Sequence, residues 1–513
     1  MTHSKTEDIF RSEASAPGID AAAEASVAPS PRSLFWTVFP SIMLPMFMAV
    51  ADQTIVATAL PAIASSLGGV ERISWVVVSY LIANTIAAPV YGRLGDSFGR
   101  RRMMLVALMV FMTGSVCCAL APSINWLTAA RVLQGFGGGG LMTLSQALIG
   151  ETVPPRERGR YQGYLAGVMV SSSTFGPVAG GYLTQAFGWP SIFLVNVPLG
   201  LGALLLVLRL EARPGDRRRT TFDAPGLVLF IMFVSPVIFA LAQVQHMSAG
   251  WLPETLGLLA LGAASLLLLV WQEGHSVSPL IPPRLFKDPS VWRGDGLAAC
   301  HGAALVSLIT FLPMYLRAAR GTAPAETGLL LFPLTFGIGL GSLITGQLVT
   351  RTGRTAIFPT CGYLVATAGL LFLAFWVPHL TLAQLPWVFG GTALFMGTVM
   401  GVVQVTVQAI AGQRMLGAGA AMVQFSRSVG AAFGTAAVAA VLFSVLAAGD
   451  PDKANLFGMI LDRGPDAIAS LAPVRQTAVR AQIGDAFRAA FATIAAFTSV
   501  GAWLAWSMPL RRL

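Results

Sequence analysis

The amino-acid sequence predicts an all-α membrane protein with about fourteen transmembrane helices and both termini in the cytoplasm. Of its 513 residues, 55% are hydrophobic and only 11% are charged, whereas soluble domains carry about 25% charged residues. Long apolar runs recur along most of the chain, and arginines gather in alternate loops between them. Because a soluble fold could not cover this much apolar surface, most of the chain is expected to face lipid.

Fourteen runs approach the length that a spanning helix needs, which is about 20 mostly apolar residues. They lie near residues 34–61, 74–92, 103–121, 124–150, 160–183, 189–209, 224–244, 254–272, 295–316, 326–349, 356–377, 384–411, 417–446 and 486–507. Prolines and glycines inside these runs are compatible with a membrane bundle, where neighbouring helices satisfy the freed backbone groups.

The loops predict the orientation, since cytoplasmic loops of membrane proteins are enriched in arginine and lysine. The cations assigned to the cytoplasmic side are Arg93, Arg100–Arg102, Arg156, Arg158, Arg160, Arg213, Arg217–Arg219, Arg284, Lys287, Arg293, Arg351, Arg354, Arg414, Arg511 and Arg512. Arg317 and Arg320 are exceptions, and the long loop at about 447–485 mixes both signs, as a translocated segment can. Two cytoplasmic termini require an even number of spans, which fourteen satisfies.

The chain also repeats itself. Residues 92–100 read GRLGDSFGR and are echoed by GQLVTRTGR at 346–354. A second echo, with nearly the same offset, relates Arg156, Gly159 and Gly176 to Arg414, Gly417 and Gly434. This offset predicts a 6+2+6 architecture: a disordered cytoplasmic tail (1–33), an N-terminal six-helix bundle (34–209), a linker with two extra transmembrane helices (210–290) and a C-terminal six-helix bundle (291–513). Two repeated halves around a midplane site are typical of secondary transporters.

Composition argues against several other classes of protein. The formal net charge of +10 could suggest nucleic acid, but the positions of the arginines fit membrane topology instead. The four cysteines lie in apolar stretches without the spacing of metal ligands or disulfides, so no metal site is expected. No phosphate-binding loop, zinc-protease pair or nucleophile elbow occurs. A membrane-embedded enzyme or receptor is therefore the least favoured class, and the tail lacks the pattern of a signal peptide.

Four motifs in order carry a resemblance to a known family. Residues 51–61 read ADQTIVATALP, 92–101 read GRLGDSFGRR, 131–135 read RVLQG and 176–181 read GPVAGG. Together they resemble the major facilitator superfamily, and specifically its fourteen-span drug/proton antiporter branch. The sequence departs from that branch at Trp189-Pro190, where the family usually has an arginine after the tryptophan.

The resemblance implies a proton-coupled antiporter that exports small amphipathic or toxic molecules across a bacterial inner membrane by alternating access. It would need no cofactor beyond the proton gradient. The alternatives with the same fold are a dedicated exporter of a metabolite, siderophore or antibiotic, and a symporter. The sequence does not predict the substrate itself. A periplasmic adaptor and an outer-membrane channel are the partners that could continue the route.

Asp52, Arg131 and Gln134 are the candidate proton-coupling residues. A charged side chain inside the membrane costs about 2.5–3.5 kcal/mol on insertion scales, so Asp52 is a functional candidate by default. At a rise of 1.5 Å per residue, Asp52 and Arg131 lie at about the same depth on antiparallel helices, and in the family these helices line the central cavity. The alternatives are a buried acid that is paired only for folding and an arginine that extends to the membrane surface.

Residues Gly92, Gly95, Asp96, Gly99 and Arg100 form a candidate cytoplasmic latch. The glycines permit a tight turn, and Asp96 can cap an adjoining helix or pair with an arginine. The second copy has Thr350 in place of Asp96, which places the latch mainly in the first half. Arginines that only set the topology are the alternative, and they explain neither the glycines nor Asp96.

Gly176, Pro177, Gly180 and Gly181 form the candidate antiporter motif. Proline removes a backbone donor and kinks a helix, and the glycines allow close helix approach. The resemblance implies a leak-tight seal between helices, and ordinary packing of small residues is the rival interpretation.

Four further residues are candidates for the substrate cavity. Tyr80 and Asn84 lie one turn apart in the second run. Arg427 either favours anionic or zwitterionic substrates or bonds backbone carbonyls. His301 can titrate near neutral pH, although a packed, hydrogen-bonded histidine is the favoured interpretation.

Overall fold

The computed structural model describes residues 31–68, 72–155, 157–210, 223–244, 251–277, 279–322, 324–447 and 473–512. The expected tail lies outside these residues up to position 30, as do Arg156, the arginine-rich segment 211–222 and most of the loop expected at 447–485. The described residues are almost entirely helical, and their only β-type pairing is an isolated bridge between Arg354 and Arg512. The all-α prediction is confirmed.

The helices follow the predicted runs in order. The first group comprises α1 (Pro31–Leu67), α2 (Ile73–Phe98), α3 (Arg100–Ala119), α4 (Ile124–Thr152), α5 (Arg158–Phe187), α6 (Ser191–Leu194) and α7 (Asn196–Leu208). Two helices follow, α8 (Ala224–Val244) and α9 (Trp251–His275). The last group comprises α10 (Pro289–Arg320), α11 (Pro324–Thr352), α12 (Ile357–Trp376), α13 (Leu385–Met396), α14 (Met400–Ala411), α15 (Leu416–Ala447) and α17 (Pro473–Trp506), with short 3-10 turns η2 (Leu285–Lys287), η3 (Val377–His379) and η4 (Gln413–Met415).

Several boundaries differ from the expectation. The first helix begins at Pro31, three residues before the expected start, and the last begins at Pro473 instead of 486. The run at 189–209 forms two consecutive helices, α6 and α7, and the run at 384–411 forms α13 and α14. Helices therefore extend beyond the apolar runs, because their ends need not be apolar where they leave the lipid.

In the described part of the chain, twelve helical segments are long and apolar enough to cross a membrane. The two predicted runs outside this set are α4 and α5. Most of α4 is buried against neighbours that include α2 and α3, so it can carry a glycine-rich and partly polar sequence. The count of fourteen spans and the location of the termini stay predictions.

The two halves of the chain meet through two pairs of glycines. A methyl group added at Gly92 of α2 would lie 2.6 Å from the carbonyl oxygen of Gly417 in α15. One added at Gly159 of α5 would lie 2.9 Å from the carbonyl oxygen of Gly346 in α11. Gly92 corresponds to Gly346 in the internal repeat, and Gly159 corresponds to Gly417. The two helix crossings are therefore counterparts, as expected for two repeated halves packed around a pseudo-twofold axis.

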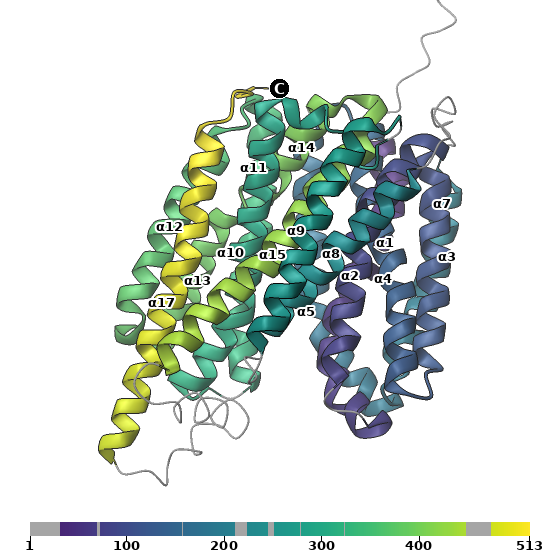
Figure 1. Ribbon diagram of the computed structural model, residues 1–513. Coiled ribbons are helices and arrows are strands. Elements are labelled where there is room, and N and C mark those ends of the chain that lie inside the picture. Colours follow the sequence, from purple (N-terminus) through teal and green to yellow (C-terminus); the bar gives the residue numbers. More distant parts are fainter. Residues whose placement is uncertain are drawn as a thin grey trace, which may run out of the picture.

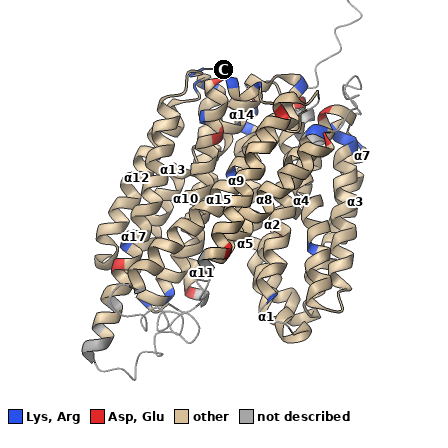
Figure 2. Ribbon diagram, viewed as in Figure 1, with Lys and Arg blue, Asp and Glu red and all other residues tan. Residues whose placement is uncertain are grey.

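These crossings lie at the end of the molecule that carries the C terminus. Many of the lysines and arginines gather at this end (Figure 2), which we call the arginine-rich face, defined by Arg100, Arg284 and Arg414. The first group of helices lies close to the last group here, and the two diverge toward the opposite end (Figure 1).

The extra helices α8 and α9 bridge the two halves. They pack on each other, and α8 contacts both α2 and α15. Phe239 of α8 stacks on Trp75 of α2 with ring centroids 4.7 Å apart, and Phe230 lies 5.1 Å from Phe425 of α15. This pair of helices therefore covers the seam between α2 and α15.

Candidate functional site

Asp52 lies in the middle of α1 and is fully buried inside the N-terminal helix group. Its Oδ2 lies 2.5 Å from Nη1 of Arg131 in α4. Its Oδ1 accepts hydrogen bonds from Gln134 and from Asn196 of α7, each at 2.8 Å. The three predicted residues are thus brought together, and a fourth joins them from a different helix.

Arg131 is held by further contacts. Its side chain is 1% exposed, its Nε donates to the carbonyl oxygen of Val76 at 3.2 Å, and its Nη1 donates to Gln134 at 2.7 Å. The guanidinium carbon lies 4.0 Å from the centre of the Tyr80 ring, a cation–π contact that is strong where water is excluded. This geometry excludes the alternative in which Arg131 extends to the membrane surface.

Ser115 and Asn196 complete the cluster, and sequence reasoning missed both. Ser115 of α3 accepts a hydrogen bond from Gln134 at 2.8 Å and one from Asn196 at 3.3 Å. Asn196 follows directly after the break between α6 and α7 and is 2% exposed. The sequence offered one signal for Asn196, which is a polar amide side chain within the otherwise apolar run 189–209. The cluster therefore ties together α1, α3, α4 and α7.

Every group that contacts the Asp52 oxygens is a hydrogen-bond donor, so the carboxylate acts only as an acceptor in this cluster. Removing either Asp52 or Arg131 would leave the charge of the other uncompensated in a low-dielectric interior. A proton that reaches Asp52 would change both the charge and the hydrogen-bond pattern on four helices at once.

The glycine motif of α5 packs directly on the helix that carries Asp52. A methyl group added at Gly176 would lie 1.9 Å from Oγ1 of Thr54, and one at Gly180 would lie 2.4 Å from Oγ1 of Thr58. Gly181 faces open space, with no atom within 4 Å of an added methyl group. The helix continues through Pro177, whose side chain is exposed. Gly176 and Gly180 therefore set the approach of α5 to α1.

Asp96 makes both kinds of contact that were considered for it, a pair with an arginine and a cap on a helix. It lies 2.6 Å from Arg100, and it accepts hydrogen bonds from the backbone N–H groups of Gly417 and Ala418 at 2.9 and 3.0 Å. Arg100 also pairs with Glu151 of α4 at 2.6 Å. Because the first N–H groups of a helix lack partners within the helix, Asp96 caps α15 across the boundary between the two halves.

The glycines of this motif act differently from the expectation. Gly92 and Gly95 lie inside α2, which extends to Phe98, and only Gly99 has a positive φ, of 94°. A methyl group at Gly95 would lie 2.8 Å from Leu144. Thus Gly99 makes the turn, while Gly92 and Gly95 allow close packing on neighbouring helices.

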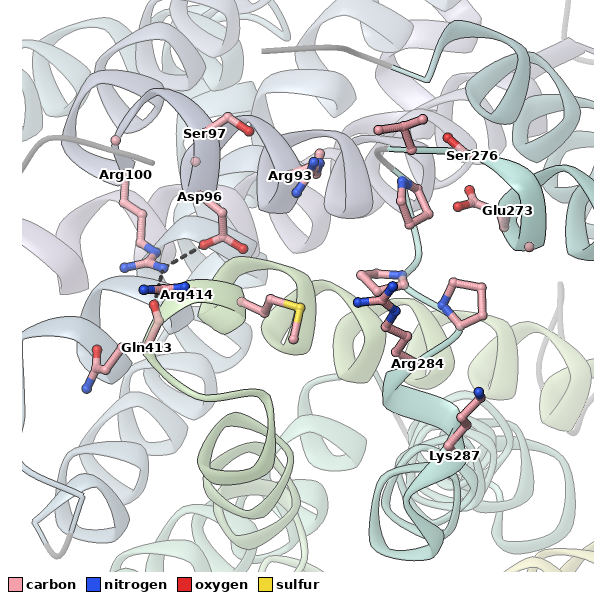
Figure 3. Close-up of a pocket in the computed structure, with 18 of the residues that line it drawn as sticks. Arg93, Asp96, Ser97, Arg100, Glu273, Ser276, Arg284, Lys287, Gln413 and Arg414 are labelled. Atoms are coloured by element: carbon pink, nitrogen blue, oxygen red, sulfur yellow. Dashed lines mark hydrogen bonds and ion pairs between the residues drawn. The ribbon is translucent and has the colours of Figure 1, made fainter. Parts of the chain in front are cut away.

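A pocket of about 1170 Å³ opens beside the latch on the arginine-rich face. Figure 3 shows Asp96 and Arg100 on one side of it, and Glu273, Arg284 and Lys287 across from them. The Oε2 of Glu273 accepts a hydrogen bond from the backbone of Ile281 at 3.3 Å. The pocket thus joins the latch to the end of α9 and the segment that follows it.

The predicted cavity residues lie in two different places. Tyr80 donates its hydroxyl to the carbonyl oxygen of Ala49 at 3.2 Å and stacks on Arg131, so it belongs to the Asp52 cluster, and Asn84 is buried one turn further along α2. His301 is buried, with Nδ1 2.9 Å from the Tyr363 hydroxyl. It lines a small cavity together with Arg427.

Asp295 is the first residue of the apolar run predicted at 295–316, but the helix that contains it begins earlier. Because α10 begins at Pro289, capped by Asp288, Asp295 lies in its second turn. It is 5% exposed, and neither carboxylate oxygen has a partner within the described residues. Asp52 is therefore not the only acid buried within a span.

These features define a membrane transporter with two repeated halves. Residues 42–435 match the family model of the Major Facilitator Superfamily. The chain belongs to this superfamily and is a multi-pass membrane transporter.

Several relatives carry transporter names. An uncharacterized MFS-type transporter of Mycobacterium tuberculosis is 35% identical over 412 residues, which cover 80% of this chain and 60% of that protein. The matched region thus spans about three fifths of the length of that relative. The multidrug transporter protein MdtP of Bacillus subtilis is 29% identical, covering 80% of this chain and 76% of that one. The acurin A biosynthesis cluster MFS-type transporter of Aspergillus aculeatus is 31% identical, covering 85% and 81%.

Two solved structures share the fold. The human organic anion transporter MFSD10 superposes with a TM-score of 0.64 at 14% identity, covering 92% of this chain and 99% of that one. The proton:xylose symporter XylE gives a TM-score of 0.60 at 15% identity, covering 94% and 97%. At these identities the likeness shows the fold alone.

Proposed function

We propose that this transporter is a proton-coupled antiporter that exports small amphipathic or toxic molecules across a bacterial inner membrane. The observation that carries the proposal is the ion pair between Asp52 and Arg131, fully buried inside a membrane-spanning bundle. Ionisable groups at such depth are costly and commonly serve proton relays or substrate binding. Names of relatives that include multidrug transporters and efflux pumps support the direction of transport.

The proton would act by changing which arrangement of the two halves is favoured. A proton or substrate shifts such an equilibrium only by binding the two states with different affinity. Protonation removes the charge that Asp52 shares with Arg131, and the same α1 packs on the glycines of α5. Proton entry would supply about 2.3 kcal/mol per charge for each 100 mV of membrane potential.

The arginine-rich face is the cytoplasmic face in this proposal, following the positive-inside rule. The Asp96 cap and the two glycine crossings then hold the cytoplasmic ends together, and their release would open the substrate path to the cytoplasm. Dedicated export of a metabolite is the second candidate, favoured by the match to a biosynthesis-cluster transporter. The adaptor and the outer-membrane channel stay predictions.

The test is substrate-dependent proton movement in liposomes that contain the purified full-length protein and a trapped pH dye. Addition of a transported compound should change the internal pH, and a protonophore should abolish compound accumulation. Transport that is insensitive to both the pH gradient and the protonophore would contradict proton coupling.

A further inference from the structure

Asp295 is a buried acid that the proposed mechanism does not use. It lies in the second turn of α10, the first helix of the last group, and is 5% exposed. Neither of its carboxylate oxygens has a hydrogen-bond partner within the described residues. Each helix group therefore begins with a helix that carries a buried aspartate. Asp52 on α1 is held by a cation and by two amide donors, whereas the described chain offers Asp295 no such partner.

The segment that holds Asp295 packs on apolar side chains. A methyl group added at Gly294 would lie 3.1 Å from Val407 of α14, and one added at Gly296 would lie 3.1 Å from Leu504 of α17. The two residues that flank Asp295 in the sequence are thus in close contact with other helices. Both carboxylate oxygens of Asp295 are buried, so water does not solvate the group in this arrangement of the helices.

The charged groups around Asp295 do not balance it. The main elements that pack on α10 are α11, α14, α15, α17 and η2. Their described charged residues, with those of the first half of α10, are Lys287, Asp288, Arg293, Glu326, Arg351, Arg427 and those of 473–488 at the far end of α17. In the described chain none of the cations forms an ion pair with Asp295. Arg293 donates instead to the carbonyl oxygen of Ser507, and Arg427 donates to the side chain of Gln424. An ionised Asp295 would therefore be an isolated charge in a low-dielectric interior, which is far more costly than a neutral acid.

We infer that Asp295 is a second proton-binding site of this transporter and that it holds a proton while the arginine-rich face is closed. A neutral carboxylic acid is the form that a buried carboxyl group adopts when no cation balances its charge. The inference deepens the proposed function and rests on it, because it adds a proton site in the second half of the chain to Asp52 in the first.

The position of Asp295 connects this proton to the movement of the two halves. The helix α10 begins just after Lys287, at the arginine-rich face. Ala298, one turn further on the same side of α10, lines a small cavity that Gln146 of the first half also lines. When the two halves separate at this face, water would reach this side of α10, and an aspartate in contact with water is ionised at neutral pH. The proton of Asp295 would then pass to the water on the cytoplasmic side.

Infrared spectroscopy of the purified full-length protein tests whether Asp295 carries a proton. A protonated carboxyl group and an ionised one absorb at different frequencies, so the spectrum of wild type minus that of Asp295→Asn should show a carboxylic acid band at neutral pH. The matched control is Asp485→Asn, because Asp485 is 59% exposed on α17 and its loss should remove only the bands of an ionised carboxylate. A difference spectrum of Asp295→Asn without a carboxylic acid band would overturn the inference.

Thermal unfolding in detergent gives an independent measurement. Asp295→Asn and Asp295→Leu should unfold at no lower temperature than wild type, because neither variant leaves a partner of the carboxyl group unpaired. The folded wild type holds a proton that the unfolded chain releases above about pH 4. Its unfolding equilibrium constant should therefore rise, relative to that of either variant, up to about tenfold per pH unit between about pH 5 and 7. Variants that fail to fold, or a difference from wild type that does not change with pH, would overturn the inference.

The outcomes separate this inference from the proposed function, because neither measurement depends on transport. A carboxylic acid band from Asp295, in a protein whose transport ignores the pH gradient, would support the proton site and contradict proton coupling. Transport that is driven by a pH gradient, in a protein without this band, would keep the proposed function and overturn the proton site. The release step predicts that the band is weaker in Asp96→Ala, which lacks the cap that joins the two halves at this face. A band of full intensity in Asp96→Ala would overturn the release.

Discussion

Asp96 in the first half of the transporter caps Gly417 in the second half, with Oδ1 of Asp96 2.9 Å from the backbone nitrogen of Gly417. The carboxylate also neutralises part of the positive end of the dipole of α15, which is a favourable place for a negative charge. This contact can exist only while α2 and α15 touch at the arginine-rich face. Asp96 therefore stabilises the arrangement in which that face is closed.

Removal of this cap should shift the conformational equilibrium. Asp96→Ala should cost about 1–2 kcal/mol, the usual worth of a helix cap, and raise the population with separated ends about 5- to 30-fold. The measurement is the distance distribution between spin labels at Arg102→Cys and Ile357→Cys, with the native cysteines replaced. Thr350→Val is the matched control, because among the described residues the Thr350 hydroxyl bonds only its own helix, at Gly346. An unchanged distribution in Asp96→Ala would refute the latch.

The glycine motif gives the next prediction. Gly176→Leu should reduce transport at least about tenfold, because any added side chain overlaps Thr54 and pushes α5 away from α1. Gly181→Leu should transport normally, because its position faces open space. Both proteins are compared at equal amounts in the membrane. Equal activity of the two variants would mean that the close approach at Gly176 is not required for transport.

The buried cluster predicts a specific pattern of stability. Arg131→Met should lower the free energy of unfolding by about 3–5 kcal/mol, because it leaves the carboxylate of Asp52 buried without its cation. Asp52→Asn combined with Arg131→Met should be more stable than Arg131→Met alone, since the uncompensated charge is gone. Thermal unfolding in detergent measures both proteins. Destabilisation of the double variant by the sum of its single effects would mean that the two residues are not coupled.

Topology is tested at the ends of two helices. A cysteine at Ala383, between α12 and α13, should react with an impermeant reagent in intact cells. One at Thr352, at the end of α11 beside the arginine-rich face, should react only after permeabilisation. The positive-inside rule is the reason, and both positions are exposed. Labelling of Thr352→Cys from outside would reverse the orientation.

From the sequence we could predict where the helices lie and how deep a residue sits in the membrane, but not how the helices pack against one another. The helix rise placed Asp52 and Arg131 at one depth because both lie in long uninterrupted helices. Ser115 and Asn196 could not be assigned, because the side of α3 and α7 that faces Asp52 depends on how those helices pack. Asp295 was misplaced because α10 begins six residues earlier than its apolar run, at Pro289.

The repeat itself contained a relationship that only the structure reveals. The sequence repeat relates Gly92 to Gly346 and Gly159 to Gly417. In the structure, however, Gly92 contacts Gly417 and Gly159 contacts Gly346. Which repeated segments touch depends on the direction of the pseudo-twofold axis. A local pattern carries no information about that axis.

The role of Asp52 as the coupling group is tested most directly by pH-gradient-driven transport in liposomes, with wild type, Asp52→Asn and Asp52→Glu compared at equal protein. Asparagine keeps the shape but cannot release a proton or carry a charge, whereas glutamate keeps the acid and lengthens its reach. We predict that Asp52→Asn retains substrate binding and loses transport driven by the gradient, while Asp52→Glu keeps part of it with a shifted pH profile. Full gradient-driven transport by Asp52→Asn would contradict this account and make Asp295, a second carboxylate buried within a span, the next group to test.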